Sequence, residues 1–210
     1  MTSSVQMIEP IWTALGPDRA KALLGLHAFT GADTTGRFNG IGKQTWFKLF
    51  LDTEDVVDEL RTLCSTADIS DEIQLTLEQF VCTAYRPKGI NISRIPELRW
   101  YMFCKYMVES LKLPPTLGAL KQHILRAHVQ ARIWGQATVY QQALLDPLEN
   151  GYHVNSNGQR RLMSHQHLMP LLRWSDVSAK ETARQTVAHA SQISWYAQTY
   201  VFAAHTAIMM

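Results

Sequence analysis

The feature that most constrains the fold of this sequence is a pair of glycines, Gly40 and Gly42, placed between two apolar segments. Leucine and phenylalanine recur at helical spacing up to Gly31, which stands where helices commonly end. A second amphipathic segment begins near Lys43. Because glycine allows tight backbone turns that other residues resist, the pattern predicts two helices joined by a polar loop at residues 30–39 and a hairpin at residues 40–42.

The start of the second predicted helix is a candidate anion site. Its first backbone N–H groups have no partner within the helix, and the helix dipole places positive charge there. Lysines add charge near this end, so the candidate phosphate-binding residues are Gly40, Ile41, Gly42, Lys43 and Lys48. A branched side chain at Gly42 is expected both to strain the turn and to block the phosphate. A plain connection between two helices is an equally good explanation of the glycines.

Two tetrapeptides in this stretch, Thr30-Gly31-Ala32-Asp33 and Gly40-Ile41-Gly42-Lys43, give it a resemblance to a known family. The stretch resembles the helix-hairpin-helix, or helix-three-turn-helix, region of the flap endonucleases, which are structure-specific nucleases. The resemblance implies that the hairpin grips the phosphate backbone of duplex or branched DNA, with a potassium ion bound at the hairpin. It also implies that Asp33 is a metal-binding carboxylate, with Mg or Mn as the metal.

The chain departs from the family pattern in two respects. Lys43 follows the glycine turn where the family commonly has proline or another small residue. The family's other catalytic acids lie upstream, in a large parallel-sheet domain, and few residues precede the motif here. A two-metal centre needs several carboxylates around its ions. We therefore assign no catalytic residue, and we expect no DNA cleavage by this chain alone with magnesium or manganese.

Three functions stay open at this stage. The resemblance favours sequence-independent DNA binding by a truncated or degenerate flap-endonuclease-like module. The chain could instead be part of a metal-dependent nuclease that a missing domain completes. A third hypothesis is a helical protein-interaction scaffold that binds no nucleic acid.

The rest of the sequence predicts an all-α chain with one small β-hairpin. Capped amphipathic segments recur from Pro17 to Gln136, and Asn157-Gly158 is a turn signal between two short segments that suit paired strands. A change in composition after Leu145 predicts a helical domain at residues 1–145 and a C-terminal extension at residues 146–210. The expected helices cover residues 17–29, 43–51, 53–63, 71–85, 96–111, 117–136 and 178–210, with a strand or loop at 1–16 and a hairpin at 152–163.

Four aromatic residues near the middle of the chain allow two interpretations; they are Trp100, Tyr101, Phe103 and Tyr106. Such rings can form a platform on which nucleic-acid bases stack. An apolar stripe at helical spacing more often belongs to a core, so burial of these rings is the favoured prediction.

The histidines and cysteines form no metal-binding pattern. His123 and His128 are five residues apart, which does not bring them onto one helix face, so core or surface positions are expected. The three cysteines are isolated and odd in number, which argues against a disulfide framework and favours a reducing, intracellular compartment. If the DNA-binding hypothesis is correct, the nucleus is a natural location.

Charge gives only a local indication of function. The net charge of +2 is too small to indicate a nucleic-acid partner. Residues 86–133 are locally basic, which is typical either of a nucleic-acid-binding surface or of solvated helix faces. No apolar run in the sequence is long enough to span a membrane, so a membrane partner is not expected.

Overall fold

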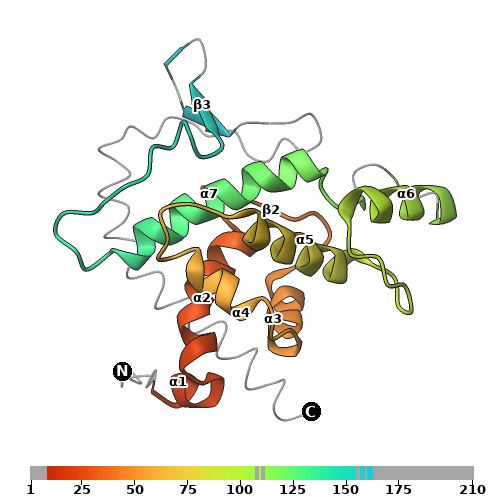
Figure 1. Ribbon diagram of the computed structural model, residues 1–210, viewed down its shortest axis with the longest axis horizontal. Coiled ribbons are helices and arrows are strands. Elements are labelled where there is room, and N and C mark those ends of the chain that lie inside the picture. The colour runs from red at the N-terminus through yellow and green to blue at the C-terminus, as the bar shows by residue number, and fades with distance from the viewer. Residues whose placement is uncertain (1–8, 107–108, 110–111, 155–156, 159, 163–210) are drawn as a thin grey trace, which may run out of the picture.

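The computed structural model describes residues 9–106, 109, 112–154, 157, 158 and 160–162. Within these residues the chain is all-α with a small antiparallel β-hairpin, as the sequence predicts (Figure 1). In chain order the elements are α1 (Glu9–Leu15), α2 (Pro17–Thr30), β1 (Gly31–Ala32), β2 (Gly36–Arg37), α3 (Lys43–Asp52), α4 (Val57–Thr62), α5 (Asp71–Tyr85), α6 (Ile95–Tyr106), α7 (Leu117–Gly135), β3 (Tyr152–Val154) and β4 (Arg160–Leu162).

The core is built around a cluster of buried aromatic rings. Phe38, between β2 and α3, lies 4.9 Å from Trp46 of α3, and Trp46 lies 5.2 Å from Phe80 of α5, measured between ring centroids. Phe29 of α2 joins the same cluster, and His123 of α7 meets it edge-on. Because Phe38 is buried here, the connection between α2 and α3 is anchored in the core.

The helices α2 and α4 approach each other closely at Gly25. A Cβ atom added to Gly25 would lie 1.9 Å from the carbonyl oxygen of Leu60, so no other residue fits this position without movement of a helix. The missing side chain lets the two backbones meet. This contact fixes α2, whose C-terminal end leads into the glycine turn.

The predicted helical character of residues 17–136 is confirmed. At the starts of two of its helices, α5 and α7, a side chain also caps the helix. Ser70 Oγ accepts a hydrogen bond from the N–H of Ile73 at the start of α5. Thr116 Oγ1 accepts one from the N–H of Ala119 at the start of α7. Each cap satisfies an N–H group that the helix itself leaves unpaired.

Three boundary predictions are wrong. The helix expected at residues 96–111 is α6, which ends at Tyr106, and Glu109 is not helical. Residues 9–15 form helix α1, where a strand or loop was expected. The helix expected to begin at residue 53 begins instead at Val57, because α3 continues through Asp52 and the acidic residues after it form a turn. In that turn the N–H of Val57 donates to the carbonyl of Glu54.

Two short antiparallel pairs accompany the helices. The predicted hairpin at 152–163 is confirmed as β3 paired with β4, with Tyr152 opposite Leu162. A second pair, which the sequence did not predict, lies inside the polar loop at 30–39, where Ala32 stands opposite Gly36. The expected helix at 178–210 lies outside the described residues.

The helix α6 contradicts the prediction that its aromatic residues are buried. Ile95, Leu98 and Met102 form its buried face. Trp100 and Phe103 are 70% and 52% exposed. The helix is apolar on more than one side, so spacing alone did not identify the side that packs on the core.

Two further observations concern the membrane and thiol predictions. Among the helices in the described residues, none is long and apolar enough to cross a membrane.

Cys64, Cys82 and Cys104 are free thiols. Burial raises the pKa of Cys64 to about 11 and that of Cys82 to about 12, so neither is a reactive thiolate at neutral pH.

Candidate nucleic-acid interface

The turn between α2 and α3 leaves the start of α3 exposed and without a capping side chain. Gly40 has a φ of +77°, a conformation that favours glycine, and Gly42 is the N-cap residue. The carbonyl of Gly42 accepts hydrogen bonds from the N–H groups of Thr45 and Trp46. The backbone N–H groups that precede these two therefore stand at the positive end of the helix.

The prediction that a branched residue at Gly42 would strain the turn is wrong. Gly42 has φ −82° and ψ 162°, which any L-residue adopts. A Cβ atom added there would meet nothing within 4 Å. A side chain at Gly42 would project into open space beside the helix start, where it would hinder a ligand and leave the fold intact.

Lys43 turns away from the helix start and onto the C-terminal end of α2. Its Nζ lies 2.8 Å from the carbonyl oxygen of His27, 3.0 Å from His27 Nδ1 and 3.0 Å from Thr30 Oγ1. Burial lowers the pKa of Lys43 to about 7, and the negative charge of Asp33 opposes this only in part. The side chain expected to meet a phosphate thus has three contacts inside the fold.

Side chains from separate segments bind the last carbonyl groups of α2. The helix leaves these groups without partners of its own, and the negative end of its dipole favours cationic donors. The contacts are Lys43 Nζ to His27 O, Thr35 Oγ1 to Ala28 O at 3.0 Å, and His123 Nε2 to Phe29 O at 2.6 Å. Together with Phe38 in the core, they fix the course of the chain from α2 to the glycine turn.

His123 and His128 are both buried, which agrees with one of the positions expected for them. His123 Nδ1 lies 3.1 Å from the carbonyl oxygen of Thr35, and His128 Nδ1 lies 2.9 Å from that of Leu63. Burial lowers the pKa of His123 to about 4, and the positive charge of Arg126 adds to this effect. The two carbonyl contacts of the ring oppose this lowering, and through them His123 links α7 to the end of α2 and to the loop that follows it.

Asp33 is exposed in the turn between β1 and β2. In the part of the chain that the structure describes, His, Cys, Asp and Glu side chains form no group of three that could hold a metal ion. The described residues therefore do not supply the several carboxylates that a two-metal cleavage centre needs. Mg or Mn at Asp33, and potassium at the hairpin, remain predictions that rest on the family resemblance alone.

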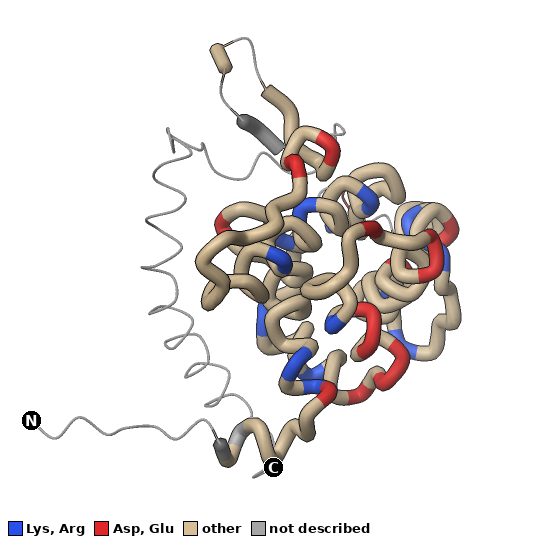
Figure 2. The backbone as a smooth tube through the Cα atoms, turned by 60° about the vertical axis from the view of Figure 1, so that its left-hand side comes forward, with Lys and Arg blue, Asp and Glu red and all other residues tan. Residues whose placement is uncertain are grey.

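Exposed cationic side chains lie on both sides of the glycine turn in the sequence. Arg37 in β2 and Lys48 in α3 are both exposed, and residues 34–51 contain no acid. Ile41, within the turn, is half-buried and packs on the core. Acids and bases are mixed over the backbone as a whole (Figure 2), so this local grouping distinguishes the turn better than the net charge does.

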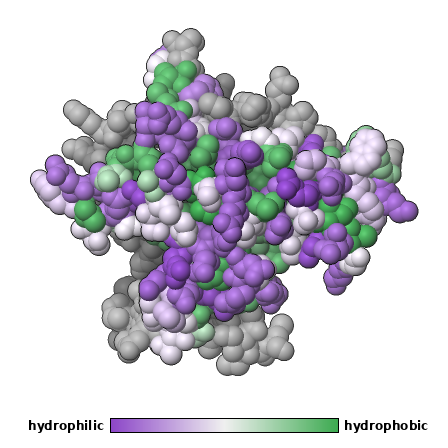
Figure 3. Space-filling view, in the orientation of Figure 1, coloured by the Kyte–Doolittle hydropathy of each residue, from purple (hydrophilic) through white to green (hydrophobic). Residues whose placement is uncertain are grey.

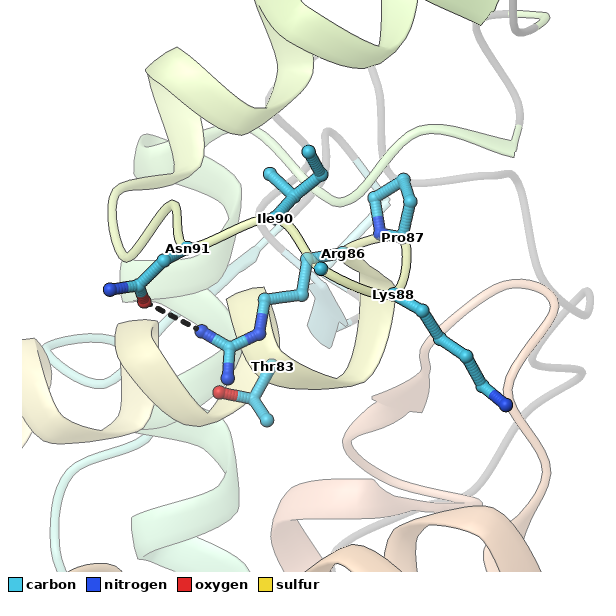
Figure 4. A pocket seen from close by; sticks show the side chains of 7 residues that line it. Thr83, Arg86, Pro87, Lys88, Ile90 and Asn91 are labelled. Atoms are coloured by element: carbon cyan, nitrogen blue, oxygen red, sulfur yellow. Dashed lines mark hydrogen bonds between the residues drawn. The ribbon is translucent and has the colours of Figure 1, made fainter.

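A second basic loop follows Tyr85, whose side chain contacts the residue before the glycine turn. Tyr85, at the end of α5, donates a hydrogen bond from its hydroxyl to the carbonyl of Asn39 at 2.8 Å. The loop after Tyr85 forms a shallow pocket lined by Thr83, Arg86, Pro87, Lys88, Gly89, Ile90 and Asn91. Figure 4 shows Arg86 turned toward Asn91, with which it forms a hydrogen bond, while Lys88 extends in another direction.

The sequence identified Lys88 as part of a basic stretch, but it gave no sign that Tyr85, just before this loop, contacts Asn39, just before the glycine turn. That contact joins residues 46 positions apart. Lys48 and the glycines remain on the surface, as the phosphate hypothesis requires. The exposed residues of the turn and its flanks thus include Gly40, Gly42, Arg37 and Lys48.

Comparison with known proteins gives no match to this chain among family models, curated proteins or solved structures.

Proposed function

We propose that this chain binds duplex DNA through its phosphate backbone, independently of base sequence, at the connection between α2 and α3. The observation that carries this proposal is the exposed, uncapped start of α3 at Gly42. Backbone N–H groups at a helix start, together with the helix dipole, favour a phosphate. Contacts to phosphate carry no base information, so the binding is not sequence-specific.

The surroundings of the turn support the proposal. Because the ammonium of Lys43 lies against α2, the positive charge for the DNA comes from the exposed side chains of Arg37, Lys48 and Lys88. The turn is also anchored by Phe38 and by the bonds to the end of α2. A fixed turn binds a phosphate with little loss of conformational entropy.

A helical interaction scaffold and an incomplete nuclease are the competing functions. The scaffold would have no need of accessible N–H groups at Gly42, and the nuclease would need carboxylates beside Asp33. A DNA-binding measurement with variants of the turn distinguishes the scaffold from the proposed DNA-binding function. A cleavage assay with magnesium or manganese tests the nuclease.

The decisive variant is Gly42→Val, because the structure has room for the side chain and the fold should be unchanged. We expect fluorescence anisotropy of labelled duplexes to show weaker binding by roughly tenfold, equally for unrelated sequences. Lys48→Ala should weaken binding less than Gly42→Val does. It should also reduce the slope of log affinity against log salt concentration by about 1, since one fewer phosphate is neutralised. Lys21→Ala, at an exposed lysine of α2, is the matched control and should bind like the unaltered chain.

Circular dichroism would verify that each variant is folded. Equal duplex affinity in Gly42→Val, Lys48→Ala and the unaltered chain would contradict the proposal and favour the scaffold. Affinity that does not fall as salt is raised would contradict it as well, since binding to phosphates releases counterions.

A further inference from the structure

The exposed face of α6 combines aromatic rings with positive charge. Trp100 is 70% exposed, Phe103 52% and Tyr106 51%, although large aromatic residues contribute most of the apolar area that a core can bury. Figure 1 shows α6 at the right-hand end of the molecule, beyond α5 and away from α1. In Figure 3 apolar and hydrophilic side chains alternate over this end of the surface.

The helix that carries these rings is firmly attached to the body. The buried carboxylate of Glu78, on α5, accepts a hydrogen bond from the N–H of Ile95 at 2.8 Å, at the start of α6. Glu78 also forms an ion pair with Arg94 at 3.3 Å. Leu98 and Met102 pack into the core from the opposite side of the helix. The outer rings are therefore presented on a fixed element and not on a loop.

The rings lie close enough to act together. The ring centroids of Trp100 and Phe103 are 6.5 Å apart, with an interplanar angle of 33°. A shallow groove beside them is lined by Ile92, Glu97, Trp100, Tyr101, Cys104 and Lys105. The groove thus brings an aromatic face and the exposed ammonium of Lys105 to one place.

The charge near α6 fits an anionic partner. From Thr83 to Tyr106 the basic residues besides Arg94, which is paired with Glu78, are Arg86, Lys88, Arg99 and Lys105. Glu97, which lines the groove, is the only acid in that segment of the sequence. Single-stranded nucleic acid is bound by this combination of stacking rings and cationic side chains, because each of its bases offers a free π-face and each nucleotide a phosphate. Bases inside a duplex are already stacked on their neighbours and cannot use the rings.

We propose that the exposed face of α6 binds single-stranded DNA, with unpaired bases stacked on Trp100 and Phe103 and a phosphate held by Lys105. This site lies on a different element from the glycine turn. It therefore goes beyond duplex binding at Gly42 and does not depend on it.

The test is the affinity of the full chain for a labelled oligothymidylate, measured by anisotropy. Trp100→Ala should weaken binding by roughly tenfold, since stacking on one aromatic side chain contributes about this much per base. Trp100→Phe, which keeps a ring, should retain most of the affinity. Trp12→Ala is the matched control, because Trp12 on α1 is also exposed, at 45%, and it should bind like the unaltered chain.

Duplex DNA of the same length separates the two sites. Trp100→Ala should leave duplex affinity unchanged, and Gly42→Val should lower oligothymidylate affinity less than Trp100→Ala does. Equal oligothymidylate affinity in Trp100→Ala and the unaltered chain would overturn the proposal, as would an equal loss in Trp12→Ala. Self-association that Trp100→Ala abolishes, without oligothymidylate binding, would overturn it too and would identify the face as a contact between copies of the chain.

Discussion

Two opposing effects act on the ammonium of Lys43: its hydrogen-bond contacts stabilise the charge, and its burial destabilises it. It is within hydrogen-bond distance of His27 O and Thr30 Oγ1 at the end of α2. Burial nevertheless lowers its pKa from 10.5 to about 7. The folded chain therefore holds this proton less tightly than the unfolded chain does, and between pH 7 and pH 10.5 the unfolded state binds more protons. Stability should rise with pH across that window.

Lys43→Met tests this sign. As pH is raised from 7 to 10, we expect the unaltered chain to gain free energy of unfolding relative to the variant, by on the order of 3 kcal/mol. Urea unfolding at several pH values would measure the difference, and Lys48→Met, at the exposed lysine of the same helix, is the control. The same pH dependence in Lys43→Met and the unaltered chain would show that Lys43 is not the group responsible.

At the scale of elements, the contact between α2 and α4 depends on Gly25. Because an added Cβ atom would lie 1.9 Å from the Leu60 carbonyl oxygen, Gly25→Ala must push the two helices apart. We expect a loss of about 2–3 kcal/mol in the free energy of unfolding, the upper range for overpacking a core, measured by urea unfolding. Gly42→Ala introduces the same methyl group into open space and should cost far less. Equal effects of the two substitutions would mean that the helices adjust freely.

The elements that the sequence predicted correctly are those determined by near neighbours. The caps at Ser70 and Thr116 each use an N–H three residues away, and the pattern of the sequence contains both partners. The exposed face of α6 could not be predicted in this way, since the helix is apolar on several sides and Glu78, on another helix, fixes its start.

The candidate site shows the same distinction between local and distant determinants. The turn at Gly40 was predictable from glycine itself, and Gly40 does adopt a positive φ. The contacts of the Lys43 side chain were not predictable, because its partner His27 lies 16 positions away and only the packing of α3 against α2 brings them together. Tertiary contacts thus decided which of the candidate cations remain exposed.

At the scale of the whole molecule, the β3–β4 hairpin and the residue before it are joined to the helical body by polar contacts that are buried or partly buried. Arg126 Nη1, in α7, donates to the carbonyl of Gly151 at 3.2 Å. The hydroxyl of Tyr152 donates to the carbonyl of Thr34 at 3.1 Å, next to Asp33 and the β1–β2 turn. The predicted domain boundary at residue 145 precedes both contacts, so a chain that ends there would lose them.

Removal of the Tyr152 hydroxyl measures how strongly the hairpin and the body depend on each other. Tyr152→Phe keeps the partly buried ring and should lower the free energy of unfolding by about 1 kcal/mol, the net contribution of one hydrogen bond. A chain ending at residue 145 should lose more, about 2–3 kcal/mol, because the buried guanidinium of Arg126 also loses an acceptor.

Val154→Ala, at an exposed position of the same strand, is the control and should have little effect. Urea unfolding of the four chains would measure these differences. Equal stability of the unaltered chain and the chain ending at residue 145 would show that the helical body is an independent domain, and that the contacts of Gly151 and Tyr152 add nothing to its stability.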